Sequence, residues 1–119
     1  MYVQGFLIAV PEENKEAYRK MAELAAGKFA EYGVSEIVET WEDAVTDGKV
    51  TDYRMATKAK PGEKIVFSWM IWPDKETCEA AHARMENDDF WTEQMGEMPF
   101  DGMRMMWGGF SPLFVMGRD

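Results

Sequence analysis

The sequence is short of the residues on which many functional sites depend. Among its 119 residues there is one cysteine, Cys78, and one histidine, His82. A single cysteine excludes a disulfide within the chain, and a single imidazole excludes a metal site built from several histidines. No acidic loop has calcium-binding spacing and no glycine-rich loop could cradle a phosphate, so we predict no metal and no cofactor.

Cations and long apolar runs are also scarce. The chain has 13 Lys and Arg against 22 Asp and Glu, a net charge of −9. This balance argues against a nucleic acid or an anionic membrane as partner, because clustered cations bind both. The longest apolar runs, Phe6–Val10 and Ile65–Trp72, are too short to cross a bilayer. The first cation, Lys15, follows two acids, so we expect no secretory signal and a cytoplasmic protein.

Apolar and aromatic residues are plentiful by contrast. Hydrophobic residues make up 46% of the chain, with seven Phe, five Trp, four Tyr and 11 Met. The length suits one domain over residues 1–119. So much apolar bulk in a small domain leads us to expect that part of it is buried against a second subunit.

Hydrophobic periodicity and turn residues divide the chain into two similar halves. The expected strands are Tyr2–Val10, Val34–Val45, Lys64–Trp72 and Met103–Phe110, the last weakened or bulged by its glycines. The expected helices span 12–32, with Gly33 as the stop, and 74–87, with further helical turns over 90–98. A long polar loop, 46–63, with a short strand at 50–55, joins the halves, and 111–119 forms a tail.

Each half ends its first strand with proline and begins its helix with an acid, Pro11-Glu12 and Pro73-Asp74. The resulting order, strand-helix-strand twice, predicts an α+β fold of the ferredoxin-like βαββαβ type. Such a fold has a four-stranded antiparallel sheet with both helices on one face.

The third strand is apolar on both faces, which predicts a homodimer. Alternation along a strand directs Ile65, Phe67, Trp69 and Ile71 one way and Val66, Met70 and Trp72 the other. Helices cover one face only, so a second copy related by a two-fold axis is expected to cover the other. The alternative cover is the chain's own loop 46–63 and tail 111–119.

Several motifs occur in an order that resembles the YbaA-like proteins, a small bacterial family of unassigned function. They are Tyr2-Val3-Gln4-Gly5-Phe6, Asp47-Gly48-Lys49-Val50-Thr51, Val66-Phe67-Ser68-Trp69, Met98-Pro99-Phe100-Asp101-Gly102, Arg104-Met105 and Gly108-Gly109-Phe110. The resemblance covers about residues 2–112. It implies a dimeric α+β barrel, and it implies no particular reaction, because this fold serves many functions.

Two interpretations are open for each chemically versatile side chain in the second helix. His82 is a candidate general base or axial haem ligand, or a half-exposed helix residue on the same face as Cys78. Cys78 is a candidate reactive thiol near a helix start, or a small buried hydrophobe.

The remaining candidates lie near strand ends. Asp101 and Arg104 form either a base with an anion clamp or an ion pair that fixes the loop before the last strand. The aromatic set either lines a pocket for a planar ligand or packs as core. Its members are Trp41, Trp69, Trp72, Trp91, Trp107 and Tyr53. The methionines Met98, Met103, Met105 and Met106 form an adaptable surface or fill gaps in the core.

We therefore carry three functional hypotheses. The first is a homodimeric barrel that binds a small apolar or aromatic molecule. The second is a cofactor-independent monooxygenase or isomerase that uses His82, Asp101, Arg104 and Trp41. The third is a haem-binding barrel that uses His82. A basic stretch, 49–64, and an acidic one, 74–101, lead us to expect that the loop lies over the acidic segment, within the chain or across the dimer, or that the two are unrelated solvated faces.

Overall fold

A computed structural model describes residues 1–118 and contains one sheet of four antiparallel strands. The strands are β1 (Tyr2–Pro11), β2 (Glu36–Glu39), β3 (Glu63–Trp72) and β4 (Met106–Phe110). Their order across the sheet is β2-β3-β1-β4, with β1 and β3 in the centre. The α+β class and the four-stranded antiparallel sheet predicted from the sequence are thus confirmed.

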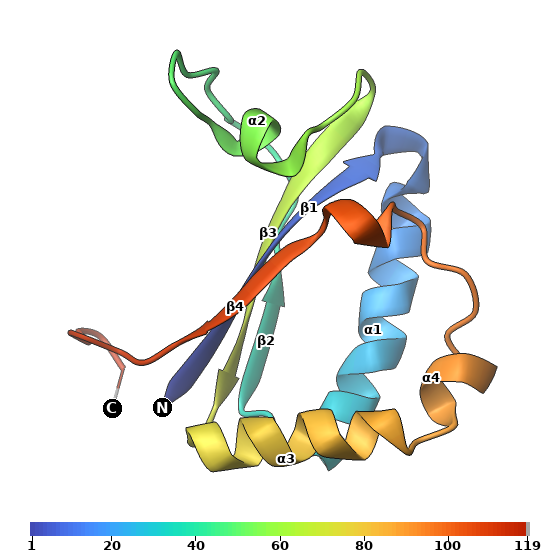
Figure 1. Ribbon diagram of the computed structural model, residues 1–119, viewed down its shortest axis with the longest axis vertical. Helices are drawn as coiled ribbons and strands as arrows, with labels where there is room; N and C mark the ends of the chain where they lie inside the picture. The colour runs from blue at the N-terminus through green and yellow to red at the C-terminus, as the bar shows by residue number, and fades with distance from the viewer. Residues whose placement is uncertain (119) are drawn as a thin grey trace.

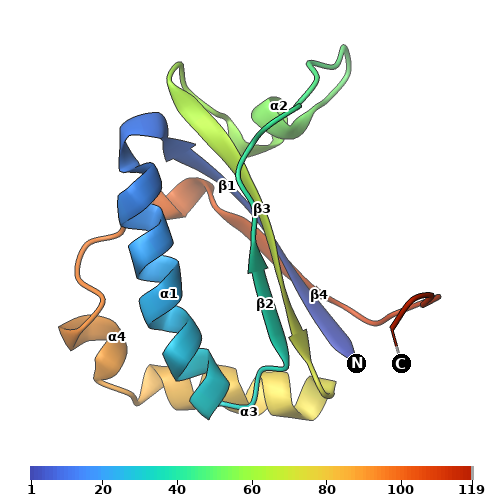
Figure 2. The same ribbon diagram turned by 180° about the vertical axis from the view of Figure 1, so that it is seen from behind.

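Of the two long helices, α1 (Lys15–Glu31) runs along one face of this sheet, and α3 (Lys75–Glu86) lies crosswise at the end of the sheet where β3 finishes (Figures 1 and 2). A 3-10 turn, η1 (Glu12–Asn14), leads into α1, and Gly33 follows its end with a φ of +102°. A short helix, α4 (Phe90–Glu93), and a second 3-10 turn, η2 (Gly102–Arg104), connect α3 to β4. The helix α2 (Tyr53–Thr57) lies apart from the others, near the end of the sheet where β3 begins.

Several boundaries differ from the prediction because side chains cap the backbone locally. The predicted strand at 50–55 is replaced by α2, since the Asp52 carboxylate accepts a hydrogen bond from Met55 N and starts a helical turn. The final strand begins at Met106 rather than 103, because Asp101 caps η2 through Met103 N. The second strand ends at Glu39 rather than 45, and α4 is shorter than the predicted 90–98.

The glycines of β4 do not bulge the strand. The ladder between β1 and β4 continues in register through Gly5↔Gly108 and Gln4↔Gly109. A Cβ atom at Gly109 would lie 2.0 Å from the Tyr2 hydroxyl oxygen. The absence of a side chain at Gly109 therefore makes room for the Tyr2 ring.

The core between sheet and helices is divided into two clusters. One is centred on Trp72 and contains Tyr32, Met70, Cys78 and Ala81. The other consists of Ile8, Val10, Tyr18 and Val66. Val66 and Trp72 are fully buried, as expected for the strand face that meets the helices.

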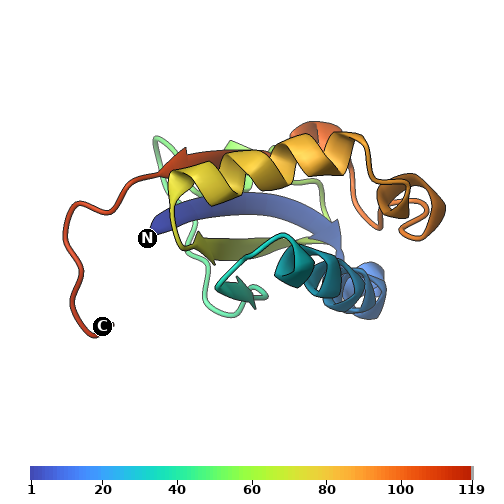
Figure 3. The same cartoon turned by 90° about the horizontal axis from the view of Figure 1, so that it is seen from below.

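The opposite face of the sheet, called the open face below, is covered in part by the chain itself. Near the start of β3, Ile65 is 2% exposed, and the Tyr53 ring of α2 packs edge-on against Phe67. Further along, Phe67 and Phe110 stay 47% and 61% exposed. The chain beyond β4 extends away from the helices (Figure 3); residue 119 of the predicted tail lies outside the described residues.

Candidate functional site

A cavity of about 370 Å³ lies between the helical layer and the sheet. It exists because α1 faces the sheet with small side chains at this level, Ala22, Ala25 and Ala26. The walls are mostly aromatic rings and methionines. They are Phe6, Tyr18, Phe29, Trp91, Phe100 and Trp107, with Met21, Met70, Met85, Met95, Met98 and Met105.

One group of polar side chains in this cavity is centred on Glu39, the last residue of β2. The Tyr18 hydroxyl of α1 donates a hydrogen bond of 2.7 Å to Glu39 Oε1. Ser68 lies opposite Glu39 in the β2–β3 register and lines the same cavity. A carboxylate and two hydroxyls from three different elements therefore meet in apolar surroundings.

These surroundings shift both titratable groups toward their neutral forms. Glu39 as a whole residue is exposed to solvent, yet the protein atoms around its carboxyl group desolvate it and raise its pKa. The hydrogen bond from Tyr18 lowers this pKa again, but by less than desolvation raises it. Burial and the adjacent carboxylate also raise the pKa of Tyr18, so its hydroxyl keeps its proton and acts as a donor.

A second polar group lines the cavity where β1 faces α3. The Trp72 indole donates a hydrogen bond of 2.8 Å to Gln4 Oε1, which leaves the Gln4 amide nitrogen toward His82 Nε2, also at 2.8 Å. Because Gln4 Nε2 can only donate, His82 Nε2 acts as the acceptor, and the imidazole carries its proton on Nδ1. A haem iron at His82 Nε2 would have to displace Gln4.

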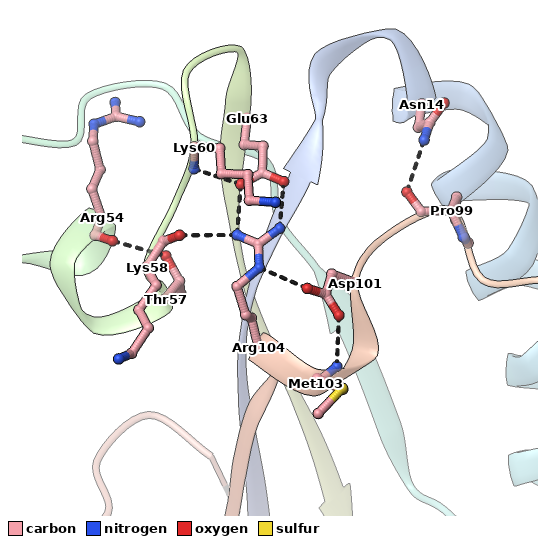
Figure 4. Close-up of polar contacts among 10 residues, drawn as sticks. All are labelled: Asn14, Arg54, Thr57, Lys58, Lys60, Glu63, Pro99, Asp101, Met103 and Arg104. Carbon is pink, nitrogen blue, oxygen red and sulfur yellow. Dashed lines mark hydrogen bonds and ion pairs between the residues drawn. The ribbon is translucent and has the colours of Figure 1, made fainter.

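Asp101 and Arg104 pair with each other outside the cavity. Arg104 Nε donates to Asp101 at 2.9 Å, and both terminal nitrogens of Arg104 reach the Glu63 carboxylate at 2.7 Å. Figure 4 shows the guanidinium held between these acids and the Lys58 carbonyl, which accepts at 3.0 Å. In Figure 4, Asp101 also accepts from Met103 N, and Asn14 of η1 holds the Pro99 carbonyl nearby. The arrangement fixes the loop before β4 to the start of β3.

The other predicted residues are divided between core, surface and cavity. Trp41 packs beside the second core cluster under the Lys15 ammonium and does not line the cavity. Cys78 is 3% exposed, and its burial raises the thiol pKa, which favours the buried-hydrophobe interpretation. Of the tryptophans, Trp91 and Trp107 line the cavity, while Trp69 lies on the open face.

Within residues 1–118, no group of three or more His, Cys, Asp and Glu side chains could hold a metal ion. No helix of that range is long and apolar enough to span a membrane. No ion pair in this part of the chain joins a cation of 49–64 to an acid of 74–101. Arg54 pairs instead with Glu42 and Asp47.

A larger hollow of about 830 Å³ lies on the open face of the sheet. Leu7, Phe67 and Phe110 of the strands line it, together with Phe114 and Met116 of the chain beyond β4. Arg118 reaches back to Glu36 at 3.0 Å, so this segment borders the hollow without filling it. The result is an apolar groove with few polar groups.

Comparison with known proteins identifies the family. A family model described as "Protein of unknown function (DUF1428)" matches residues 1–102. The chain belongs to this family. The "Uncharacterized protein YbaA" of Escherichia coli strain K12 is 51% identical over 112 residues, covering 94% of this chain and 96% of that protein. The protein of the same name from Shigella flexneri gives the same values. The resemblance to YbaA-like proteins is confirmed.

Among solved structures, the "De novo designed protein Foldit4" is 14% identical, with a TM-score of 0.45, over 93% of this chain and 97% of that protein. Membership of the DUF1428 family supplies no reaction, so the cavity of this family member has to be interpreted from its own residues.

Sequence reasoning missed three of the polar side chains that line the cavity, Gln4, Tyr18 and Glu39. Tyr18 is buried in α1, but nothing in the sequence pairs its hydroxyl with a particular residue. In Glu36-Ile37-Val38-Glu39 each face of the strand has one acid and one aliphatic residue, so alternation does not say which acid points inward. In the structure Ile37 points into the cavity, and Glu39, two residues later, therefore lies on the same face of the strand.

Proposed function

We propose that this protein binds a small, mostly apolar molecule in the cavity between α1 and the sheet. The observation that carries the proposal is the cavity itself, about 370 Å³ of space walled by aromatic rings and methionines. Ligand sites typically combine such walls with a few convergent polar groups. Here those groups are Glu39 with Tyr18 on one side and Gln4 with His82 on the other.

The test uses the uncharged fluorescent probe N-phenyl-1-naphthylamine, whose emission rises in apolar surroundings. Ala26 lines the cavity, so Ala26→Phe fills it. Ala30 lies on the exposed side of the same helix, so Ala30→Phe is a matched control. We expect saturable probe binding to the wild type and to Ala30→Phe, and at least tenfold weaker binding to Ala26→Phe. Equal binding by all three, with folding confirmed by circular dichroism, would overturn the proposal.

We also propose that the open face of the sheet is the contact between two copies, in a ferredoxin-like dimeric barrel. The strand order β2-β3-β1-β4 supports that arrangement. Large exposed apolar side chains support the contact, since a monomer would leave Phe67, Phe110 and Phe114 in water. The groove bordered by the chain beyond β4 gives a second copy an apolar surface on which to pack.

Native mass spectrometry at low micromolar concentration tests this assembly directly. We expect a dimer as the main species, and a monomer at all concentrations would contradict it. We place the dimer in the cytoplasm, in keeping with a lone cysteine that is buried and unpaired.

A further inference from the structure

The charge inside the cavity is of one sign. Among its lining residues the titratable groups are Glu39, Tyr18 and His82, and none is Lys or Arg. The first turn of α1 contributes Lys15, but this ammonium lies over the Trp41 ring, 5.4 Å from its centre. Within residues 1–118, no ion pair joins Glu39 to a cation.

A carboxylate that is partly desolvated and has no cationic partner is costly to keep ionised, and the exposure of Glu39 to water makes this cost modest. Tyr18 and Ser68 offset part of that cost through hydroxyl groups, yet desolvation prevails and the pKa of Glu39 stays raised. A ligand that carries a positive charge would supply the missing countercharge. An anionic ligand would meet repulsion from Glu39, and a neutral ligand would leave the cost in place.

The walls of the cavity favour the same class of ligand. Aromatic rings such as Phe29, Trp91 and Phe100 present electron-rich faces, which attract organic cations and repel anions. The surrounding methionines are flexible and polarizable, so they adapt to bulky apolar substituents. Gln4 with His82 adds a polar contact without adding a fixed charge.

We infer that the ligand of this cavity is a lipophilic organic cation, an amine or quaternary ammonium with an apolar body, whose charge is neutralised by the Glu39 carboxylate. The inference rests on the proposed binding function and adds the chemical class of the ligand to it. The juxtaposition that carries it is one acid, without a cationic partner among the described residues, in the lining of an aromatic cavity.

Two probes of nearly equal size separate charge from apolar bulk: 4-phenylbutylamine, a cation at pH 8, and 4-phenylbutan-1-ol, which is neutral. Calorimetric titration should show the amine binding the wild type at least tenfold more tightly than the alcohol. In Glu39→Gln we expect this preference to disappear, with the alcohol affinity unchanged within about twofold. Glu36→Gln is the matched control, because Glu36 lies on the same strand but bonds Trp69 and Arg118 outside the cavity.

Acidification provides a second readout. The amine stays cationic down to pH 5, so its affinity should fall as Glu39 becomes protonated, whereas the alcohol affinity should not change. His82 is the other side chain in the cavity lining that can carry a positive charge. The series is therefore repeated in His82→Gln, where the fall should persist.

Each contrary outcome has a distinct meaning. Equal binding of amine and alcohol to the wild type would overturn the cation inference and leave the proposed binding function standing. An amine preference that survives in Glu39→Gln would overturn the role of Glu39. If neither compound binds or displaces N-phenyl-1-naphthylamine, and that probe does not bind either, the proposed function fails together with the inference.

Discussion

We expect ionisation of Glu39 to reduce the stability of the folded protein. Its pKa is higher in the folded than in the unfolded chain, so the folded state holds the proton more tightly. The free energy of unfolding therefore decreases as pH rises from the ordinary carboxyl pKa through the raised one. Below this pH window the Glu39 side chain is neutral in the folded and the unfolded state, so its ionisation no longer affects the free energy of unfolding.

Glu39→Gln should accordingly raise the thermal midpoint at pH 7.5 by about 1 °C, a small shift because Glu39 is exposed to solvent, and leave it unchanged at pH 3.5. The glutamine keeps an oxygen for the Tyr18 hydroxyl while removing the charge. Glu36→Gln should act in the opposite direction at neutral pH, because hydrogen bonds lower the pKa of Glu36. Differential scanning calorimetry at the two pH values measures both; a destabilised Glu39→Gln at pH 7.5 would contradict the expectation.

Gln4 stabilises the core because it satisfies a buried donor. Trp72 is fully buried, and its indole nitrogen bonds to Gln4 Oε1. Gln4→Leu should therefore lower the free energy of unfolding by about 2 kcal/mol, since the indole N–H loses its acceptor. His82→Ala leaves that bond in place and should cost less than about 1 kcal/mol. Urea unfolding compares the two variants. Equal losses of unfolding free energy would show that the hydrogen bond from Trp72 does not account for the stabilisation by Gln4.

At the scale of elements, Arg104 joins β3 to the turn before β4. Its guanidinium bridges Glu63 and Asp101, and only 14% of its side chain is exposed. Arg104→Met keeps the aliphatic stem but leaves the Glu63 carboxylate without its partner, so the free energy of unfolding should fall by about 2 kcal/mol.

The double variant Arg104→Met with Glu63→Gln separates pairing from packing. It removes the uncompensated charge and should recover part of the stability that the single variant loses. No recovery would mean that Arg104 acts through packing of its stem alone. Guanidinium unfolding curves for the four proteins of this cycle provide the measurement.

The sequence predicted the bounds of an element well where glycine or proline flanked an apolar run of matching length. The strand β3 was placed within one residue, because an apolar run lies between Gly62 and Pro73. The segment 50–55 was wrongly predicted as a strand. Its helix depends on one capping carboxylate, that of Asp52, and a hydrophobic pattern gives no indication of a cap. Pairing of Asp101 with Arg104 was foreseen as one alternative, whereas the bond of Arg104 to Glu63 depends on contacts 41 residues apart and was not.

The sequence predicted the chemical character of the candidate site but not the residues that form its polar groups. Abundant aromatic residues and methionines indicated an apolar ligand, and two of the predicted tryptophans, Trp91 and Trp107, do line the cavity. The position of Glu39 against Tyr18 joins residues from β2 and α1 that no motif connects. Such a pairing depends on how the helix crosses the sheet, which local sequence does not determine.

For the whole molecule, the open face of the sheet governs the predicted assembly. Phe67 is 47% exposed in its centre, whereas Val50 is 94% exposed in the loop 46–63. Phe67→Lys should convert the dimer to a monomer, because an ammonium cannot be buried between two apolar sheets. Val50→Lys should leave it a dimer. Light scattering after size-exclusion chromatography gives the masses, and a dimeric Phe67→Lys would contradict the proposed contact.

The division of the core into two clusters has a consequence for the fate of the protein in a cell. The cavity borders both clusters, so whatever fills it would join them into one continuous interior. A bound molecule stabilises the form that binds it, by about 2.7 kcal/mol at a hundred times its dissociation constant. The empty protein would unfold more often and be exposed to proteases more often. Its abundance would thus follow the supply of its ligand, with no change in synthesis.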